Sequence, residues 1–152
     1  MNPKIVSPWS SDWVWSLPLI VATVTFHILG LGLLYQRLSF VLASKVNKHH
    51  PLIVLMLVVG GTALFATVLH GLEGWMWAAA YVLLGALPDL KSATLYSLGA
   101  MTTFGHAEIK LELRWQLMGP LESLDGWILF GLTTAFLLAI IQNVWHASNR
   151  SN

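Results

Sequence analysis

The chain has 152 residues, of which 56% are hydrophobic and only 10% are charged, and its formal net charge is +1. Because soluble domains carry about 25% charged residues, this composition indicates a membrane protein. The lack of cysteine excludes a disulfide framework and a thiolate metal site, and the near-neutral charge argues against nucleic acid as a partner.

The first apolar segment runs from Trp13 to about Phe40, which is longer than the roughly 20 residues that a bilayer-spanning helix needs. It follows a polar start at residues 1–12 and carries Pro18 in its expected first turn, where proline is tolerated. His27 is its only ionisable residue near mid-depth. No small-residue cleavage site follows the run, so we expect an uncleaved membrane segment.

The second apolar segment begins at Pro51, after a polar linker at 43–50, and continues to about Leu87. It is longer than one span and too short for two. Two alternatives follow. One is a single long helix that projects past the membrane. The other is a break near Gly71–Gly74, because glycine is a poor residue for helix interiors.

The run from Asp89 to Glu108 lies between the second apolar segment and the last one, which extends from Met118 to Trp145. Asp89 follows a proline and is expected to cap a short helix from about Leu90 to Met101, with an extended turn at 102–107. Such a segment at membrane depth is tolerated only where it is buried in protein or lines a water-filled path. We therefore expect the functional site of the protein in this run.

A recognisable pattern runs through residues 51–145: Leu95-Tyr96-Ser97-Leu98, then Met101-Thr102-Thr103-Phe104-Gly105-His106-Ala107-Glu108, flanked by Pro88-Asp89, Arg114-Trp115, Leu121-Glu122 and the stretch Gly126 to Leu137. Together with the order of the apolar segments, these residues resemble the pore domain of the potassium-channel superfamily, above all its small bacterial two-transmembrane-pore members. The apolar segments predict an all-α membrane protein with three transmembrane helices. The resemblance, which covers the last two of them, implies a re-entrant pore helix, a filter loop and a homotetrameric architecture.

In that family a ring of backbone carbonyls replaces the water shell of the ion, and glycine allows the positive φ that alternate filter residues need. The resemblance implies a selectivity filter at Thr102, Thr103, Phe104, Gly105, His106 and Ala107. The expected ligand is a permeant monovalent cation, potassium in the first place. We expect no catalysed reaction and no cofactor, and membrane lipid as the surrounding partner.

The outer half of this turn reads His106-Ala107-Glu108, where the family has Tyr-Gly-Asp. Alanine costs about 1 kcal/mol or more in a left-handed conformation, and imidazole titrates near neutrality. A non-selective or pH-modulated cation pore is therefore the alternative within the channel class. A non-conducting subunit of another complex is a further alternative.

The remaining candidate residues have two interpretations each. Glu108 is a cation-attracting pore mouth or a solvated charge, and Glu122 and Asp125 are expected to support the filter by hydrogen bonding to the back of the pore loop, since an acid in a span is costly unless paired. Gly126 and Gly131 are gating hinges or close-packing positions. Cavity or gate positions are Thr133, Thr134, Ile140, Ile141 and Val144, although the last three also suit a packed helix end.

Outside the channel class, His27 and His70 could ligate a haem or a metal if they lie on facing helices. His70 lies further toward one side of its span than His27, so the sequence does not require them to meet. Glu73 is three residues from His70 on one helix face, and a local hydrogen bond also explains this pair.

The expected organisation is a transmembrane helix and cytoplasmic linker at 1–50, a pore domain at 51–145 and a short tail at 146–152. The positive-inside rule gives a formal tie between four residues on each side (Arg37, Lys45, Lys48 and Arg150 against Lys4, Lys91, Lys110 and Arg114). The first set is more concentrated and has no acidic neighbours. We therefore expect a multi-pass protein of the cell inner membrane with its N-terminus outside and its C-terminus cytoplasmic. An outer aromatic belt is expected from Trp9, Trp13, Trp15, Trp75, Trp77 and Trp115.

Overall fold

A computed structural model describes residues 8–45, 51–105 and 108–149 of the chain. Every element in these ranges is helical: α1 (Pro8–Lys45), α2 (Pro51–Leu83), α3 (Leu90–Met101), the short 3₁₀ helix η1 (Leu113–Trp115) and α4 (Met118–Asn149). Three stretches are long and apolar enough to cross a membrane, at Ser11–Leu38, Leu52–Leu83 and Leu113–His146. The expectation of an all-α chain with three candidate spans is confirmed.

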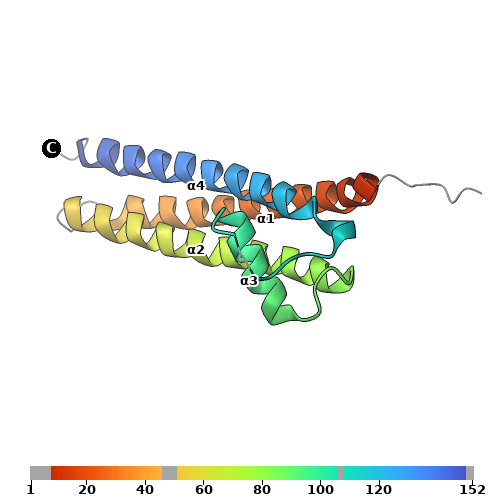
Figure 1. Cartoon of the computed structure of the whole chain (residues 1–152). Helices are drawn as coiled ribbons and strands as arrows, with labels where there is room; N and C mark the ends of the chain where they lie inside the picture. Colours follow the sequence, from red (N-terminus) through yellow and green to blue (C-terminus); the bar gives the residue numbers. More distant parts are fainter. Residues whose placement is uncertain (1–7, 46–50, 106–107, 150–152) are drawn as a thin grey trace, which may run out of the picture.

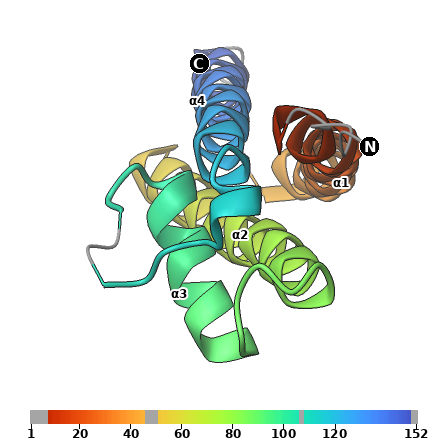
Figure 2. The same ribbon diagram turned by 45° about the vertical axis from the view of Figure 1, so that its right-hand side comes forward.

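The three long helices lie side by side, and α3 lies obliquely against α2 and α4, in the half of the bundle farther from the C-terminus (Figure 1). Both α1 and α3 pack against α2 and α4. They do so from opposite sides, as Figure 2 shows. The short helix is therefore held by the two long helices that precede and follow it in the chain, while α1 supports the same pair from behind.

Helix α1 begins at Pro8, so the expected polar start at 1–12 is too long and the expected position of Pro18 in a first turn is wrong. Pro18 lies inside the helix. Pro8, in contrast, suits the first helical position, because the N–H that proline lacks would have no partner there and the φ of proline is already helical. The helix also accommodates its polar first turns, since Asp12 and Ser16 are buried at 2% and 0% exposure.

Helix α2 is unbroken from Pro51 to Leu83, so the alternative with a break near Gly71–Gly74 is wrong. Gly74 has a packing role instead of a breaking one. A side chain there would lie 3.1 Å from Leu98 of α3, and the Gly74 carbonyl accepts a 2.6 Å hydrogen bond from the Ser97 hydroxyl. The absence of a Cβ therefore allows α3 to approach the α2 backbone. The chain then turns through Gly85, whose φ is +67°.

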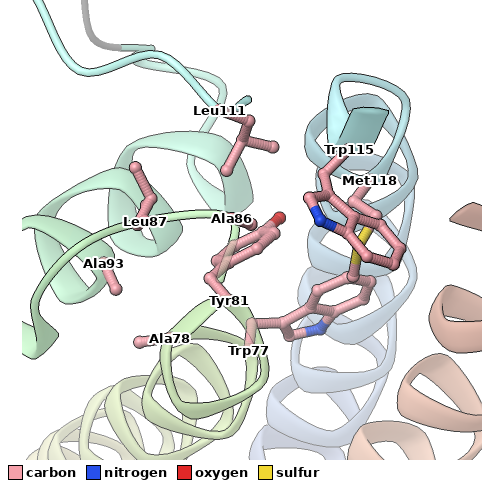
Figure 3. Packing of buried hydrophobic residues seen from close by; sticks show 9 residues of the cluster. All are labelled: Trp77, Ala78, Tyr81, Ala86, Leu87, Ala93, Leu111, Trp115 and Met118. Carbon is pink, nitrogen blue, oxygen red and sulfur yellow. The ribbon is translucent and has the colours of Figure 1, made fainter. Parts of the chain in front are cut away.

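A hydrophobic cluster holds the chain on both sides of α3, where it leaves α2 and where it enters α4 (Figure 3). It joins α2, the loop after it, α3 and the start of α4, and consists of Trp77, Ala78, Tyr81, Ala86, Leu87, Ala93, Leu111, Trp115 and Met118. The assignment of Trp77 and Trp115 to an outer aromatic belt is therefore wrong, because they are 0% and 3% exposed. The Trp77 indole N–H donates to Asp125 at 2.9 Å, so burial does not leave it without a partner.

Candidate functional site

The expected cap and bounds of α3 are confirmed. Asp89 has extended backbone angles, and its carboxylate accepts from the Ser92 amide at 2.9 Å and from the Ser92 hydroxyl at 2.7 Å. These bonds satisfy donors that the first helical turn leaves free. They also hold the pKa of the Asp89 carboxyl below its usual value, because they favour the charged form.

Glu122 of α4 lies against the buried face of α3. Its carboxyl group is hydrogen-bonded to the Ser97 hydroxyl and accepts from the Tyr81 hydroxyl at 2.6 Å. Ser97 also donates to the Gly74 carbonyl, which can only accept. One hydroxyl has a single proton, so all these contacts are hydrogen bonds only when Glu122 is neutral and donates to Ser97. Glu122 thus joins α3 to α4, as the predicted filter support would.

Asp125, the other predicted support residue, bonds to side chains of α1 and α2. Its Oδ2 accepts from the Thr23 hydroxyl of α1 at 2.7 Å and from the Trp77 indole of α2 at 2.9 Å. Its Oδ1 is buried without a hydrogen-bond partner. Asp125 therefore connects α4 to the two other long helices.

The turn that follows α3 has positive φ at two alternate residues, Thr103 (+57°) and Gly105 (+70°). The Thr103 amide donates to Ala100 and the Gly105 amide donates to Gly99, both at 3.0 Å, so the turn folds back on the end of α3. A left-handed conformation costs a β-branched residue such as threonine about 1–2 kcal/mol. Strain of this kind gathers at functional sites. His106 and Ala107 lie outside the described residues.

An open cavity of about 540 Å³ lies at the C-terminal end of α3. Three of the predicted pore residues, Thr102, Thr103 and Gly126, meet there. The full lining also includes side chains of α2 and α4: Thr67, His70, Leu98, Met101, Thr102, Thr103, Gly126, Trp127 and Phe130. Gly126 contacts the Met101 backbone, and a Cβ at this position would overlap it. The close-packing interpretation therefore fits Gly126 better than a hinge does.

The other predicted cavity and gate residues divide between the interior and the surface. Ile140 and Val144 are buried in a second cluster with Val54 and Val58 of α2. Ile141 is 38% exposed. Thr134 is exposed and bonds back to the Phe130 carbonyl at 2.8 Å, Gly131 has open space around it, and Glu108 is exposed. Within one chain, Ile140 and Val144 therefore belong to helix packing.

The two intramembrane histidines do meet. Their ring centroids are 5.0 Å apart. Glu73 lies against one edge of the pair, with Oε1 at 2.8 Å from His27 Nδ1 and Oε2 at 3.1 Å from His70 Nδ1. Thr133 lies against the other edge, with its hydroxyl 3.0 Å from His27 Nε2 and 3.1 Å from His70 Nε2. Residues of α1, α2 and α4 thus form one buried polar cluster.

Comparison with protein families, with curated proteins and with solved structures gives no match to this chain. The site must therefore be interpreted from its own geometry.

The sequence places Thr133 at a cavity, and it predicts neither the pairing of Tyr81 with Glu122 nor that of Glu73 with His27. A usable signal was present, because each is a polar residue inside an apolar segment and such residues require partners. The spacing within one helix predicts only local pairs such as His70 and Glu73, so the partners from other helices stayed hidden.

Proposed function

We propose that the chain is one subunit of a homotetrameric cation channel of the potassium-channel class, which conducts ions passively through the turn after α3. The observation that carries this proposal is the position of α3 itself. A helix too short to span a membrane packs between two long apolar helices, and its C-terminal end lies at an open cavity beside the strained turn.

The electrostatics of α3 favour a cation at this end. The macrodipole of a helix places about half a negative charge at its C-terminus. Asp89 anchors the opposite end, which is exposed, and the carboxyl end at Met101 faces the cavity. A re-entrant helix arranged in this way lowers the energy of a monovalent cation near the middle of the membrane.

The turn supplies the second part of the proposal. Positive φ at Thr103 and Gly105, with Phe104 between them, is the alternation that turns successive carbonyls toward one side. In the described state the turn folds back on α3. In the proposed tetramer four such turns surround one axis, and the cavity of each chain opens toward that axis.

The exposed side chains beside the cavity also favour association. Trp127 and Phe130 of α4 are 70% and 69% exposed and Leu98 of α3 is 40% exposed. Four copies around an axis would cover part of this surface with neighbouring chains, and lipid would cover the rest. The proposed location is the cell inner membrane, with the N-terminus outside and the C-terminus cytoplasmic.

The outer half of the filter favours weak selectivity as the second candidate. His106-Ala107-Glu108 replaces the Tyr-Gly-Asp of the family, and Ala107 tolerates a left-handed conformation less well than glycine does. We therefore expect potassium flux with measurable sodium flux, and a dependence on pH through His106.

The test is ion flux into liposomes that contain the purified tetramer, with separate readouts for potassium, sodium and protons. Thr103→Ala removes a hydroxyl at the inner end of the filter and should change the potassium to sodium ratio. Thr94→Ala is the matched control, because Thr94 is a half-buried residue within α3 whose hydroxyl donates to the Leu90 carbonyl at 2.8 Å, one helical turn back and away from the turn after α3. A protein that is tetrameric and passes none of the three cations would refute the proposal.

A further inference from the structure

We propose that His27, His70 and Glu73 bind one divalent transition-metal ion of the zinc type, at a site that borders the cavity beside the turn after α3. One ligand atom from each residue, a nitrogen or a carboxylate oxygen, lies within 4.8 Å of the other two. Imidazole and carboxylate are ligands that zinc accepts, and a site with two histidines and one glutamate leaves a fourth position open. All three ligands come from one chain, so the site does not depend on the tetramer.

When both imidazoles are neutral, one of the nitrogen–oxygen contacts in this cluster has no hydrogen between its two atoms. With both imidazoles neutral, His27 Nδ1 donates to Glu73 at 2.8 Å, and its Nε2 must then accept from the Thr133 hydroxyl. His70 Nε2 donates to the same hydroxyl. The remaining nitrogen, His70 Nδ1, then presents a lone pair to Glu73 Oε2 at 3.1 Å.

A cation between His70 Nδ1 and Glu73 Oε2 would complete this contact. Glu73 Oε2 is buried and has no hydrogen-bond partner, although it lies 3.1 Å from an imidazole nitrogen, so the contact is not aligned as a hydrogen bond. A buried carboxylate oxygen without a partner is costly. A metal ion bound by the two Nδ1 atoms and the Glu73 carboxylate satisfies this oxygen and both lone pairs together.

Thr133 fits the metal-bound state without moving. When both Nδ1 atoms ligate the metal, both Nε2 atoms carry hydrogen and donate outward. The Thr133 hydroxyl oxygen lies 3.0 Å and 3.1 Å from the two Nε2 atoms, and an oxygen with two lone pairs accepts both bonds. Thr133 is thus a positioning residue that orients both imidazole ligands from α4.

The charge around the three ligands and the route to them from the cavity both favour binding of a small cation. Asp125 of α4 is close enough to Glu73 and His27 to interact with both electrostatically. His70 is 26% exposed and lines the 540 Å³ cavity, which gives an ion a way in. A haem does not fit, because imidazoles 5.0 Å apart and bridged at both edges leave no room for a porphyrin between them.

The experiment measures metal bound to the full-length protein in detergent, after chelation and dialysis against Zn²⁺, with Co²⁺ as a spectroscopic probe. We expect one ion per chain and a visible Co²⁺ spectrum typical of tetrahedral nitrogen and oxygen ligands. Glu73→Gln and His70→Gln should abolish stoichiometric binding, and Thr133→Val should weaken it by about 10- to 100-fold.

Two control variants separate this site from adventitious binding. His146→Ala removes an exposed histidine of α4, and His49→Gln with His50→Gln removes a histidine pair in the linker. Both variants should retain one ion per chain. The wild-type Co²⁺ spectrum tests the proposal even where a ligand variant fails to fold. Wild-type protein that binds no ion, or binding that is lost with His49 and His50 while Glu73→Gln retains it, would overturn the proposal.

Discussion

Gly126 of α4 lies directly against the backbone of Met101 at the end of α3, so close that a Cβ on Gly126 would overlap the Met101 carbonyl. This contact fixes the position of the end of α3 along the axis of α4. It also places the strained turn after α3 beside the cavity. The absence of one side chain therefore positions the element on which the proposed function depends.

Substituting Gly126 tests this contact. Gly126→Ala should lower the free energy of unfolding by about 1–3 kcal/mol, because overpacking a tight contact forces the backbone to shift. Gly131→Ala, one and a half turns further along α4, meets nothing within 4 Å. It should leave stability unchanged or raise it by up to about 1 kcal/mol, since alanine is the better helix former. Reversible denaturation in detergent measures both, and equal losses in the two variants would contradict the packing role.

The strain at Thr103 predicts a stabilising substitution. Thr103→Gly should raise the free energy of unfolding by about 1 kcal/mol, because glycine adopts a φ of +57° without the steric cost that threonine has. The same substitution at Thr94, which lies within α3, should lower it by about 0.3 kcal/mol, because glycine is a poorer helix former than threonine. The two changes in the free energy of unfolding should have opposite signs, and this difference is the control. A Thr103→Gly variant less stable than wild type would show that the turn differs from the one described.

The cap at Asp89 predicts a pH dependence of stability. Its pKa is lower in the folded chain than its ordinary value of 3.8, so the unfolded chain binds more protons between these two values. The contribution is fully present above the ordinary pKa and is lost as the pH falls through the lowered one. Asp89→Asn keeps an acceptor for the Ser92 amide but has no charge. The difference in Tm between wild type and this variant should therefore shrink at low pH, and a constant difference would contradict the assignment.

Tyr81 tests the connection between α2 and Glu122. Tyr81→Phe removes the hydroxyl that donates to Glu122 at 2.6 Å and leaves a fully buried carboxyl oxygen without that donor. The expected loss is about 1–3 kcal/mol of unfolding free energy. Tyr35→Phe is the matched control, because Tyr35 is 47% exposed, and it should have little effect. If the two losses are equal, Tyr81 does not hold Glu122.

Several elements were predictable because their signals are local. The apolar runs give the three candidate spans, since length and hydropathy suffice for that decision. The bounds of α3 followed from Asp89 and from the turn residues after Met101. The structure starts α1 earlier than the sequence predicts, because Pro8 serves as a first helical residue and Asp12 is buried. Hydropathy alone cannot distinguish a polar start from polar side chains that pack inside.

The sequence by itself determined the three helices that are long and apolar enough to cross a membrane and the short capped helix between the last two, because each depends on composition or on neighbours along the chain. Only the tertiary structure decided which side chains meet. It buried Trp77 against Asp125, joined α3 to Glu122 through Ser97, and brought His27 to His70 and Glu73. The physical reason is that helix periodicity fixes the face on which a residue lies, whereas the partner on another helix depends on the axial offset between the two helices. That offset is set here by contacts such as Gly126 on Met101.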